Sequence, residues 1–195
     1  MSHGHSPATS SANAGATDDS PRAATYVVDT NVILVANGQH PDVSADCVAR
    51  CRHWLQALMA TARIAVDEGF EIVREYEHKT HASDGTGVGD AFLRWVLHEL
   101  DNPARCDQVT IVPDAARGYV GFPDDPDLAH FDASDRKFVA VARAHPEAPT
   151  ILQAADCKWL DWQPALARHG VPVRFLCEAD VHAFHLHKFG QRGHA

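Results

Sequence analysis

The sequence predicts an α/β fold, a three-layer α/β/α sandwich around a central parallel sheet of about five strands. Short apolar segments rich in β-branched residues alternate with amphipathic segments of helical period, which is typical of a parallel sheet covered on both faces. A chain of 195 residues, 45% of them hydrophobic, can bury one substantial core. Because no apolar run approaches the roughly 20 residues that span a bilayer, we expect no membrane segment.

The predicted strands and helices follow one another in alternating order. The first strand, YVV at 26–28, is a continuous apolar run, as expected of a strand buried on both faces. The most regular helical pattern covers 44–62, where apolar residues recur at i, i+3, i+4 and i+7. Further strands are predicted at 63–67, 108–113, 149–154 and 171–176, and further helices at 70–79, 90–100, 132–144 and 161–169.

One folded domain is expected over 25–178, between two tails. Residues 1–24 are small and polar and predict a disordered N-terminal tail. Residues 179–195 are rich in histidine and at most partly helical in pattern. Since no acid or cysteine is interleaved with these histidines, we interpret 179–195 as an exposed tail instead of a zinc site.

Charge and cysteine content narrow the class of protein. A net charge of −9 argues against a protein that coats nucleic acid non-specifically, because such binding needs clustered Lys and Arg. It does not exclude a nuclease, since bound cations reverse the sign of a carboxylate-lined site. The five cysteines are scattered and form no CxxC pair, so we expect buried free thiols and a cytoplasmic location.

Acidic residues stand where a site is expected. Asp29 directly follows the first predicted strand and Asp156 follows the fourth. Ligands of open parallel sheets bind beyond the carboxyl ends of the strands, so both carboxylates should emerge on the same rim. Asp132 and Asp135 lie three residues apart at the start of the predicted helix 132–144, so they share one of its sides. At the start of a helix, an acid is about equally plausible as a cap and as a metal ligand. We assign Asp132 as the cap and Asp135 as the ligand.

Glu75 stands on the predicted helix that follows the second strand. Taken alone, it is better explained as a solvated carboxylate beside Arg74 and Lys79, with Glu71 as its nearest rival for a place in the site. Grouped acids repel one another and raise each other's pKa values, and a divalent cation relieves this repulsion. Mg²⁺ and Mn²⁺ are the ions that prefer such oxygen ligands.

Four segments together resemble the PIN-domain nucleases across the whole folded region. The segments are VVDTNVIL at 27–34, EIVREY at 71–76, FDASDRKFVAVA at 131–142 and ILQAADCKW at 151–159. The first is the most specific, because a hydrophobic strand ends in Asp-Thr-Asn and is followed by an apolar run. The order and spacing of all four carry more weight than any one of them.

The resemblance implies Mg²⁺- or Mn²⁺-dependent hydrolysis of RNA, usually single-stranded, by an endoribonuclease. It places the catalytic and metal-binding carboxylates at Asp29, Glu75, Asp135 and Asp156, with Asp29 and Asp156 holding the metal from strand ends. The implied partners are RNA, an antitoxin-like protein if the chain is a toxin, and a second copy in a homodimer. The basic residues near these acids are candidate RNA contacts: Arg136, Lys137 and Lys158.

Two positions depart from the family pattern. Ala154 stands where a Ser or Thr is common, and Lys158 stands where an acid is often found, for which Asp161 could compensate. These departures support an alternative, a catalytically weak or inactive PIN-like scaffold that binds RNA or protein. A different α/β phosphohydrolase is disfavoured, because Asn31 replaces the second acid of an Asp-x-Asp motif. Trp159 and Trp162 follow Asp156 and could stack bases, although core packing is the default.

Overall fold

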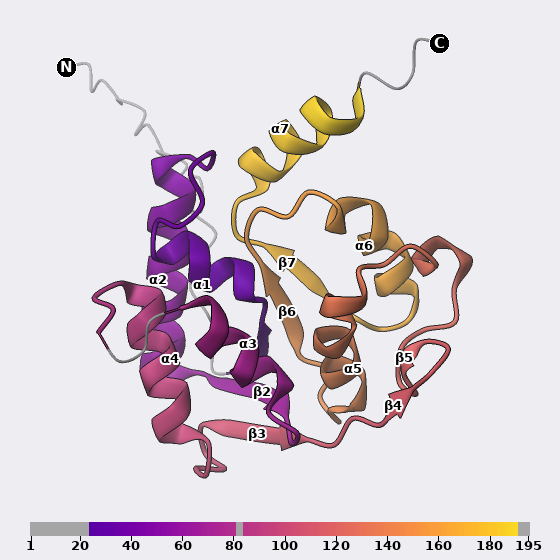
Figure 1. The fold of residues 1–195 in the computed structure, drawn as a ribbon, viewed down its shortest axis with the longest axis horizontal. Helices are drawn as coiled ribbons and strands as arrows, with labels where there is room; N and C mark the ends of the chain where they lie inside the picture. The colour runs from indigo at the N-terminus through magenta and orange to yellow at the C-terminus, as the bar shows by residue number, and fades with distance from the viewer. Residues whose placement is uncertain (1–23, 81–83, 191–195) are drawn as a thin grey trace, which may run out of the picture.

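The computed structural model describes residues 24–80 and 84–190 and shows an α/β fold with a five-stranded parallel sheet (Figure 1). The strand order is β3-β2-β1-β6-β7. Its strands are β1 (Thr25–Val28), β2 (Arg63–Asp67), β3 (Cys106–Val109), β6 (Thr150–Gln153) and β7 (Val173–Phe175). All the pairings within this sheet are parallel, so the predicted three-layer class is confirmed.

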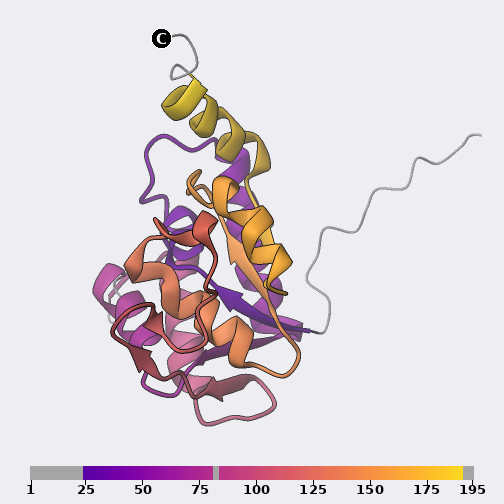
Figure 2. The same cartoon turned by 90° about the vertical axis from the view of Figure 1, so that its right-hand side faces the viewer.

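Helices cover both faces of the sheet. On one face lie α1 (Thr30–Ala36), α2 (Ala45–Thr61) and α4 (Val88–Glu99), which pack against one another, and on the other lie α5 (Arg136–Ala144) and α6 (Trp159–Arg168) (Figures 1 and 2). The helix α3 (Glu71–Lys79) follows β2. The central strand β1 is buried along its whole length, as a strand covered on both faces must be.

Buried side chains tie the short α3 to the sheet. The Asp67 carboxylate, fully buried at the end of β2, accepts hydrogen bonds from the backbone amides of Glu71 (2.7 Å) and Ile72 (2.8 Å). These are orphan N–H groups of the first helical turn, so Asp67 caps the helix from outside it. At the other side of α3, the Tyr76 hydroxyl donates to the Val28 carbonyl at the end of β1.

Three elements differ from the sequence-based prediction. The apolar run after Asp29 forms the helix α1, which the strand pattern did not predict. The predicted strand 108–113 is displaced toward the N-terminus, because β3 is an edge strand whose partner β2 ends opposite Val109. Beyond that point the chain has no ladder to join, and it forms a small antiparallel hairpin of β4 (Pro113–Asp114) and β5 (Gly118–Tyr119).

The region expected to be a C-terminal tail begins with a regular helix, α7 (Glu178–Phe189). Its first turn is fixed to α2 by hydrogen bonds from the Ser44 amide (2.9 Å) and hydroxyl (2.8 Å) to the Asp180 carboxylate. A disulfide joins Cys47 to Cys177 at the same place, so the prediction of free thiols is wrong for this pair. Spacing could not reveal it, because the two residues are 130 apart in sequence and meet only through the fold.

The predicted N-terminal tail, with the exception of Ala24, lies outside the described residues, as do 191–195 with His194. Within the described ranges, no helix combines the length and apolar character needed to cross a membrane.

Candidate functional site at the carboxyl edge of the sheet

The strand order places a topological switch point between β1 and β6. From β1 the chain moves outward to β2 and β3, then returns to β6 on the other side of β1. In open α/β sheets the crevice at the carboxyl end of such a switch point is the usual ligand site. Asp29 follows β1 and Asp156 lies three residues beyond the end of β6, so both predicted strand-end acids stand at this crevice.

Asp29 occupies the N-cap position of α1. Its carboxylate accepts a hydrogen bond of 2.8 Å from the Asn31 amide, which satisfies one of the free N–H groups of that helix. The residue is only 5% exposed. Burial, followed by the charges of Asp135, Glu75 and Asp156, raises the pKa of Asp29 well above its usual value. Asp135, Glu75 and Asp156 are therefore close enough to Asp29 for their charges to act on it.

Three half-buried carboxylates converge next to Asp29. One oxygen each from Asp132, Asp135 and Asp156 lies within 4.8 Å of the others. Burial raises the pKa of Asp135, and the neighbouring charges of Asp156 and Asp132 raise it further. Its carboxylate is held in place by the Ser134 hydroxyl at 3.0 Å and the Trp159 indole N–H at 3.3 Å. Asp135 and Asp156 therefore come together as the sequence predicted.

Asp132 has a different role from the one predicted. It stands at the N-cap of a short 3₁₀ helix, Ala133–Asp135, but its side chain makes no capping hydrogen bond. Its carboxylate instead pairs with the Lys158 ammonium and belongs to the acidic group. The assignment of Asp132 as a cap was wrong, because the first turn is 3₁₀ and the α-helix proper starts only at Arg136. The three-residue spacing from Asp135 was the signal for this shared side.

Glu75 points toward Asp29 but is already bonded to protein groups. Its carboxylate accepts a hydrogen bond from the Thr30 hydroxyl at 2.7 Å and forms an ion pair with Lys137 at 2.5 Å. Lys137 is itself buried and also donates to the Ser134 carbonyl. Glu75 is thus not the solvated acid of the alternative interpretation. Its rival Glu71 points elsewhere, since it accepts a hydrogen bond from the Tyr119 hydroxyl at 2.6 Å.

Of the remaining basic and acidic candidates, only Lys158 lies beside the acidic group. Arg136 lies over the Phe122 ring, 4.9 Å from its centroid, and not in the acidic group. Lys158 stands at the rim, where its bond to Asp132 raises its pKa. Asp161 does not replace the missing acid at position 158, because its carboxylate bonds to His185 of α7 at 2.7 Å.

The uncharged residues near the acids are partly bonded at the strand ends and partly buried in the core. The Asn31 side-chain carbonyl accepts a hydrogen bond of 2.9 Å from the Ala155 amide and so links the ends of β1 and β6. Ala154 is fully buried, so the position where the family often has a hydroxyl points into the core here. Trp159 and Trp162 are also buried and pack around Phe131, with ring centroids 5.1 and 4.4 Å away. Core packing, the default interpretation of both tryptophans, is confirmed.

A cavity of about 580 Å³ adjoins the acidic group on the side of α7. Asn31 and Asp156 form its wall toward the acids, while Phe184, His187 and Lys188 of α7 form the opposite wall. His40 also lines it, and its ring stacks on Phe184 with an interplanar angle of 17°. The Lys188 charge acts across the cavity on Cys157, whose pKa it lowers against the larger raising effect of burial. The cavity thus offers an aromatic surface and one ammonium group, together with the Asp42 carboxylate, beside the acids.

Fold and site together define a doubly wound α/β protein with an acidic centre at its topological switch point. Comparisons of the chain with protein-family models, with curated proteins and with solved structures found no match.

Proposed function

We propose that the protein is a metal-dependent endoribonuclease of the PIN type that hydrolyses single-stranded RNA. The observation that supports this most directly is the meeting of Asp132, Asp135 and Asp156 beside the buried Asp29 at the switch point. Burial and neighbouring carboxylates raise the pKa values of Asp29 and Asp135, so these two groups are costly to ionise without a compensating cation. Strongly perturbed groups in a crevice are also where functional sites concentrate.

The donor set fits Mg²⁺ or Mn²⁺. All the converging ligand atoms are carboxylate oxygens, which hard divalent cations prefer, and neither histidine nor cysteine belongs to the group. Asp29, Asp135 and Asp156 would hold the ion, with Asp132 as a further oxygen donor. Bound there, the ion would supply a water of lowered pKa and charge stabilisation at a phosphodiester.

Other residues of the site hold and orient the acids or would contact the substrate. Lys137 pairs with Glu75, and Glu75 in turn holds the hydroxyl of Thr30, the residue that follows Asp29. Trp159 and Ser134 orient the Asp135 carboxylate. Asn31 fixes the separation of the two strand ends that carry Asp29 and Asp156. Lys158 lies at the rim and would meet a phosphate oxygen of the substrate.

The cavity beside the acids is the proposed binding pocket for the nucleotide adjacent to the phosphodiester that is cleaved. Phe184 and His40 offer a flat aromatic surface for a base, and base–aromatic stacking tolerates any sequence. The Lys188 ammonium offers a cationic contact and the His187 ring a hydrogen-bonding contact for the backbone.

An antitoxin-like partner, a homodimer and a cytoplasmic location remain parts of this proposal. The cysteine argument no longer supports the cytoplasm, because the structure contains a disulfide. The second candidate, a scaffold without turnover, is favoured by one observation. Lys137 and Lys158 already pair with two of the acids, so part of the negative charge is neutralised by the protein.

Cleavage and metal binding, measured separately, distinguish the two candidates. The purified chain should cut single-stranded RNA with Mn²⁺ or Mg²⁺ and lose this activity in EDTA. Asp29→Asn and Asp156→Asn should abolish cleavage and weaken Mn²⁺ binding in calorimetry. Asp101→Asn, a change of an exposed acid in the loop after α4, is the matched control and should do neither. Cleavage that persists in EDTA and in Asp29→Asn would refute the metal-dependent mechanism at this site, whereas RNA binding without turnover would identify the scaffold.

A further inference from the structure

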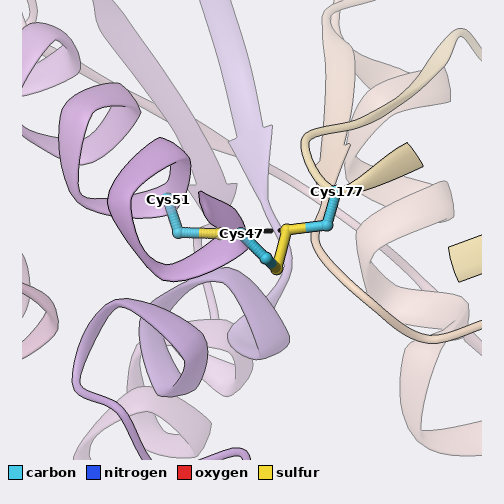
Figure 3. A group of neighbouring side chains, drawn as sticks. All are labelled: Cys47, Cys51 and Cys177. Carbon is cyan, nitrogen blue, oxygen red and sulfur yellow. Dashed lines mark hydrogen bonds between the residues drawn. A yellow bond between two sulfur atoms is a disulfide. The ribbon is translucent and has the colours of Figure 1, made fainter. Parts of the chain in front are cut away.

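Three cysteine side chains converge where the start of α2 meets the start of α7 (Figure 3). Cys47 and Cys177 form the disulfide, and Cys51 is a free thiol one helical turn after Cys47. All three residues are buried, with exposures of 0 to 3%. Sulfur atoms of the three lie within 4.8 Å of one another, and this cluster is separate from the acidic group.

The spacing of the sulfurs suits a shared metal ion. The Cys51 and Cys177 sulfurs are 3.8 Å apart, as the dashed line in Figure 3 marks. Two thiolates on one tetrahedral Zn²⁺ with Zn–S bonds of about 2.3 Å are also separated by about 3.8 Å. Cys47 and Cys51 project from the same face of α2 because they are four residues apart. Once the disulfide opens, rotation of the Cys47 side chain is the main change that a three-sulfur site requires.

The local electrostatics favour thiolates once a cation is present. Cys47 lies in the first turn of α2 and Cys177 is the N-cap of the twelve-residue α7, so two of the sulfurs sit at positive helix ends. Burial, with a contribution from Asp180, raises the pKa of the Cys51 thiol to about 12. Cys51 therefore stays protonated by itself, and its ionisation needs the charge of a metal.

A second cavity leads from solvent to this cluster. It measures about 280 Å³, and its lining includes Cys47, Cys177 and Asp180. Asp180 lines this cavity and its charge acts on Cys51, while its carboxylate accepts two hydrogen bonds from Ser44. The cavity thus gives a metal ion an entry path and a lining carboxylate as a fourth donor.

We infer that Cys47, Cys51 and Cys177, once reduced, bind a thiophilic d¹⁰ metal ion, Zn²⁺ or Cu⁺, at the junction of α2 and α7. A dithiol reductant supplies two electrons and two protons to the Cys47–Cys177 bond and becomes a disulfide itself. The three thiols then lose three protons and form three metal–sulfur bonds. Zn²⁺ takes an oxygen of Asp180 as its fourth ligand, whereas Cu⁺ is satisfied by the three sulfurs.

Disulfide and metal are thus alternative ways to fix the same junction. Each holds the start of α7 against α2, and α7 forms one wall of the cavity beside the acidic group. The inference does not depend on the proposed nuclease activity, because it uses neither the acids at the switch point nor RNA.

Metal titration of the full chain tests it. The protein is reduced with a phosphine, which leaves no competing thiol, and titrated anaerobically with Co²⁺ as a spectroscopic stand-in for Zn²⁺. Reduced wild type should show one equivalent of thiolate-to-cobalt charge-transfer absorption, which Zn²⁺ abolishes. Cobalt held by the carboxylates at the switch point gives no such band. The oxidised protein should show none, and this comparison needs no variant.

Variants then assign the ligands. Cys51→Ser keeps the disulfide but removes the third sulfur, and it should lower Zn²⁺ affinity by roughly 100-fold or more. Cys106→Ser, a change of a buried cysteine on the edge strand β3, is the matched control and should bind normally. Asp180→Asn should lower the affinity for Zn²⁺ and leave the affinity for Cu⁺ unchanged, because only Zn²⁺ uses the Asp180 oxygen as a fourth ligand. Absence of the band in reduced wild type, or a band formed by Cys51→Ser with the affinity of wild type, would overturn the inference.

Discussion

Replacing Lys137 by methionine tests how the acidic group is held together. The Lys137 ammonium is 2.5 Å from Glu75 and also bonds the Ser134 carbonyl, and its side chain is 8% exposed. Removing one partner of a buried pair costs about 3–5 kcal/mol, because the other charge is left uncompensated. Glu75 is 23% exposed, so water screens part of that cost, and we expect a loss of about 2–3 kcal/mol. For a chain of this size that corresponds to a fall in Tm of roughly 5–10 °C.

The assay is urea unfolding of four proteins: wild type, Lys137→Met, Glu75→Gln and the double variant. Because both single changes break the same pair, the double variant should be more stable than the sum of the single losses predicts, by about 1 kcal/mol or more. Adding Mn²⁺ should restore more stability to Lys137→Met than to wild type, since the freed Glu75 adds negative charge at the site. A loss below about 0.5 kcal/mol, or additive effects in the double variant, would refute the pairing.

The remaining predictions concern other parts of the structure. Asp67→Ala should destabilise the fold by about 2–4 kcal/mol in urea unfolding, since two amides of α3 lose a charged acceptor; a loss within about 0.5 kcal/mol would contradict this capping role. Without divalent ions, Asp29→Asn should raise Tm at pH 7.5, with a gain that shrinks toward pH 4. The folded chain holds the Asp29 proton to a higher pH than the unfolded chain, so stability falls as pH rises between the two pKa values, and a gain independent of pH would count against it. Cys47→Ser should cost up to about 5 kcal/mol under non-reducing conditions, because the cross-linked residues are 130 apart, and reduced wild type should lose a similar amount. If the cavity beside the acids holds a base, Phe184→Ala should raise KM for single-stranded RNA about tenfold with little change in kcat; a fall in kcat alone would place the nucleotide elsewhere.

Much of the fold could be predicted from local pattern. The YVV run predicted a buried strand, and it forms the central strand β1. The regular amphipathic pattern at 44–62 predicted α2, which spans Ala45–Thr61. The predicted start agrees with the structure because Ser44 is the N-cap and its hydroxyl accepts a hydrogen bond from the Cys47 amide. The run after Asp29 was ambiguous, since its apolar residues suit a strand or a helix equally. It became α1 because the Asp29 carboxylate caps a helix that buries Val32, Ile33 and Val35 in the core.

The candidate site was predictable in part, and the limits follow from what a side chain contacts. Strand-end position placed Asp29 and Asp156 at one crevice, and the same logic applied to Asp67 would have added a third acid. Both carboxylate oxygens of Asp67 instead accept hydrogen bonds from backbone amides of α3, which only the tertiary structure reveals. Whether a strand-end acid caps a helix or faces a ligand depends on the path of the chain over the next few residues.

The sequence by itself determined the α/β class, the parallel sheet and the acids that follow its strands, because these depend on periodicity and on neighbours close along the chain. The tertiary structure alone decided three contacts that span long separations. It paired Asp132 with Lys158, paired Glu75 with Lys137, and brought Cys177 to Cys47 and Cys51. Such contacts are set by the crossovers that carry distant segments to one edge of the sheet, and no local pattern encodes which side chains will meet there.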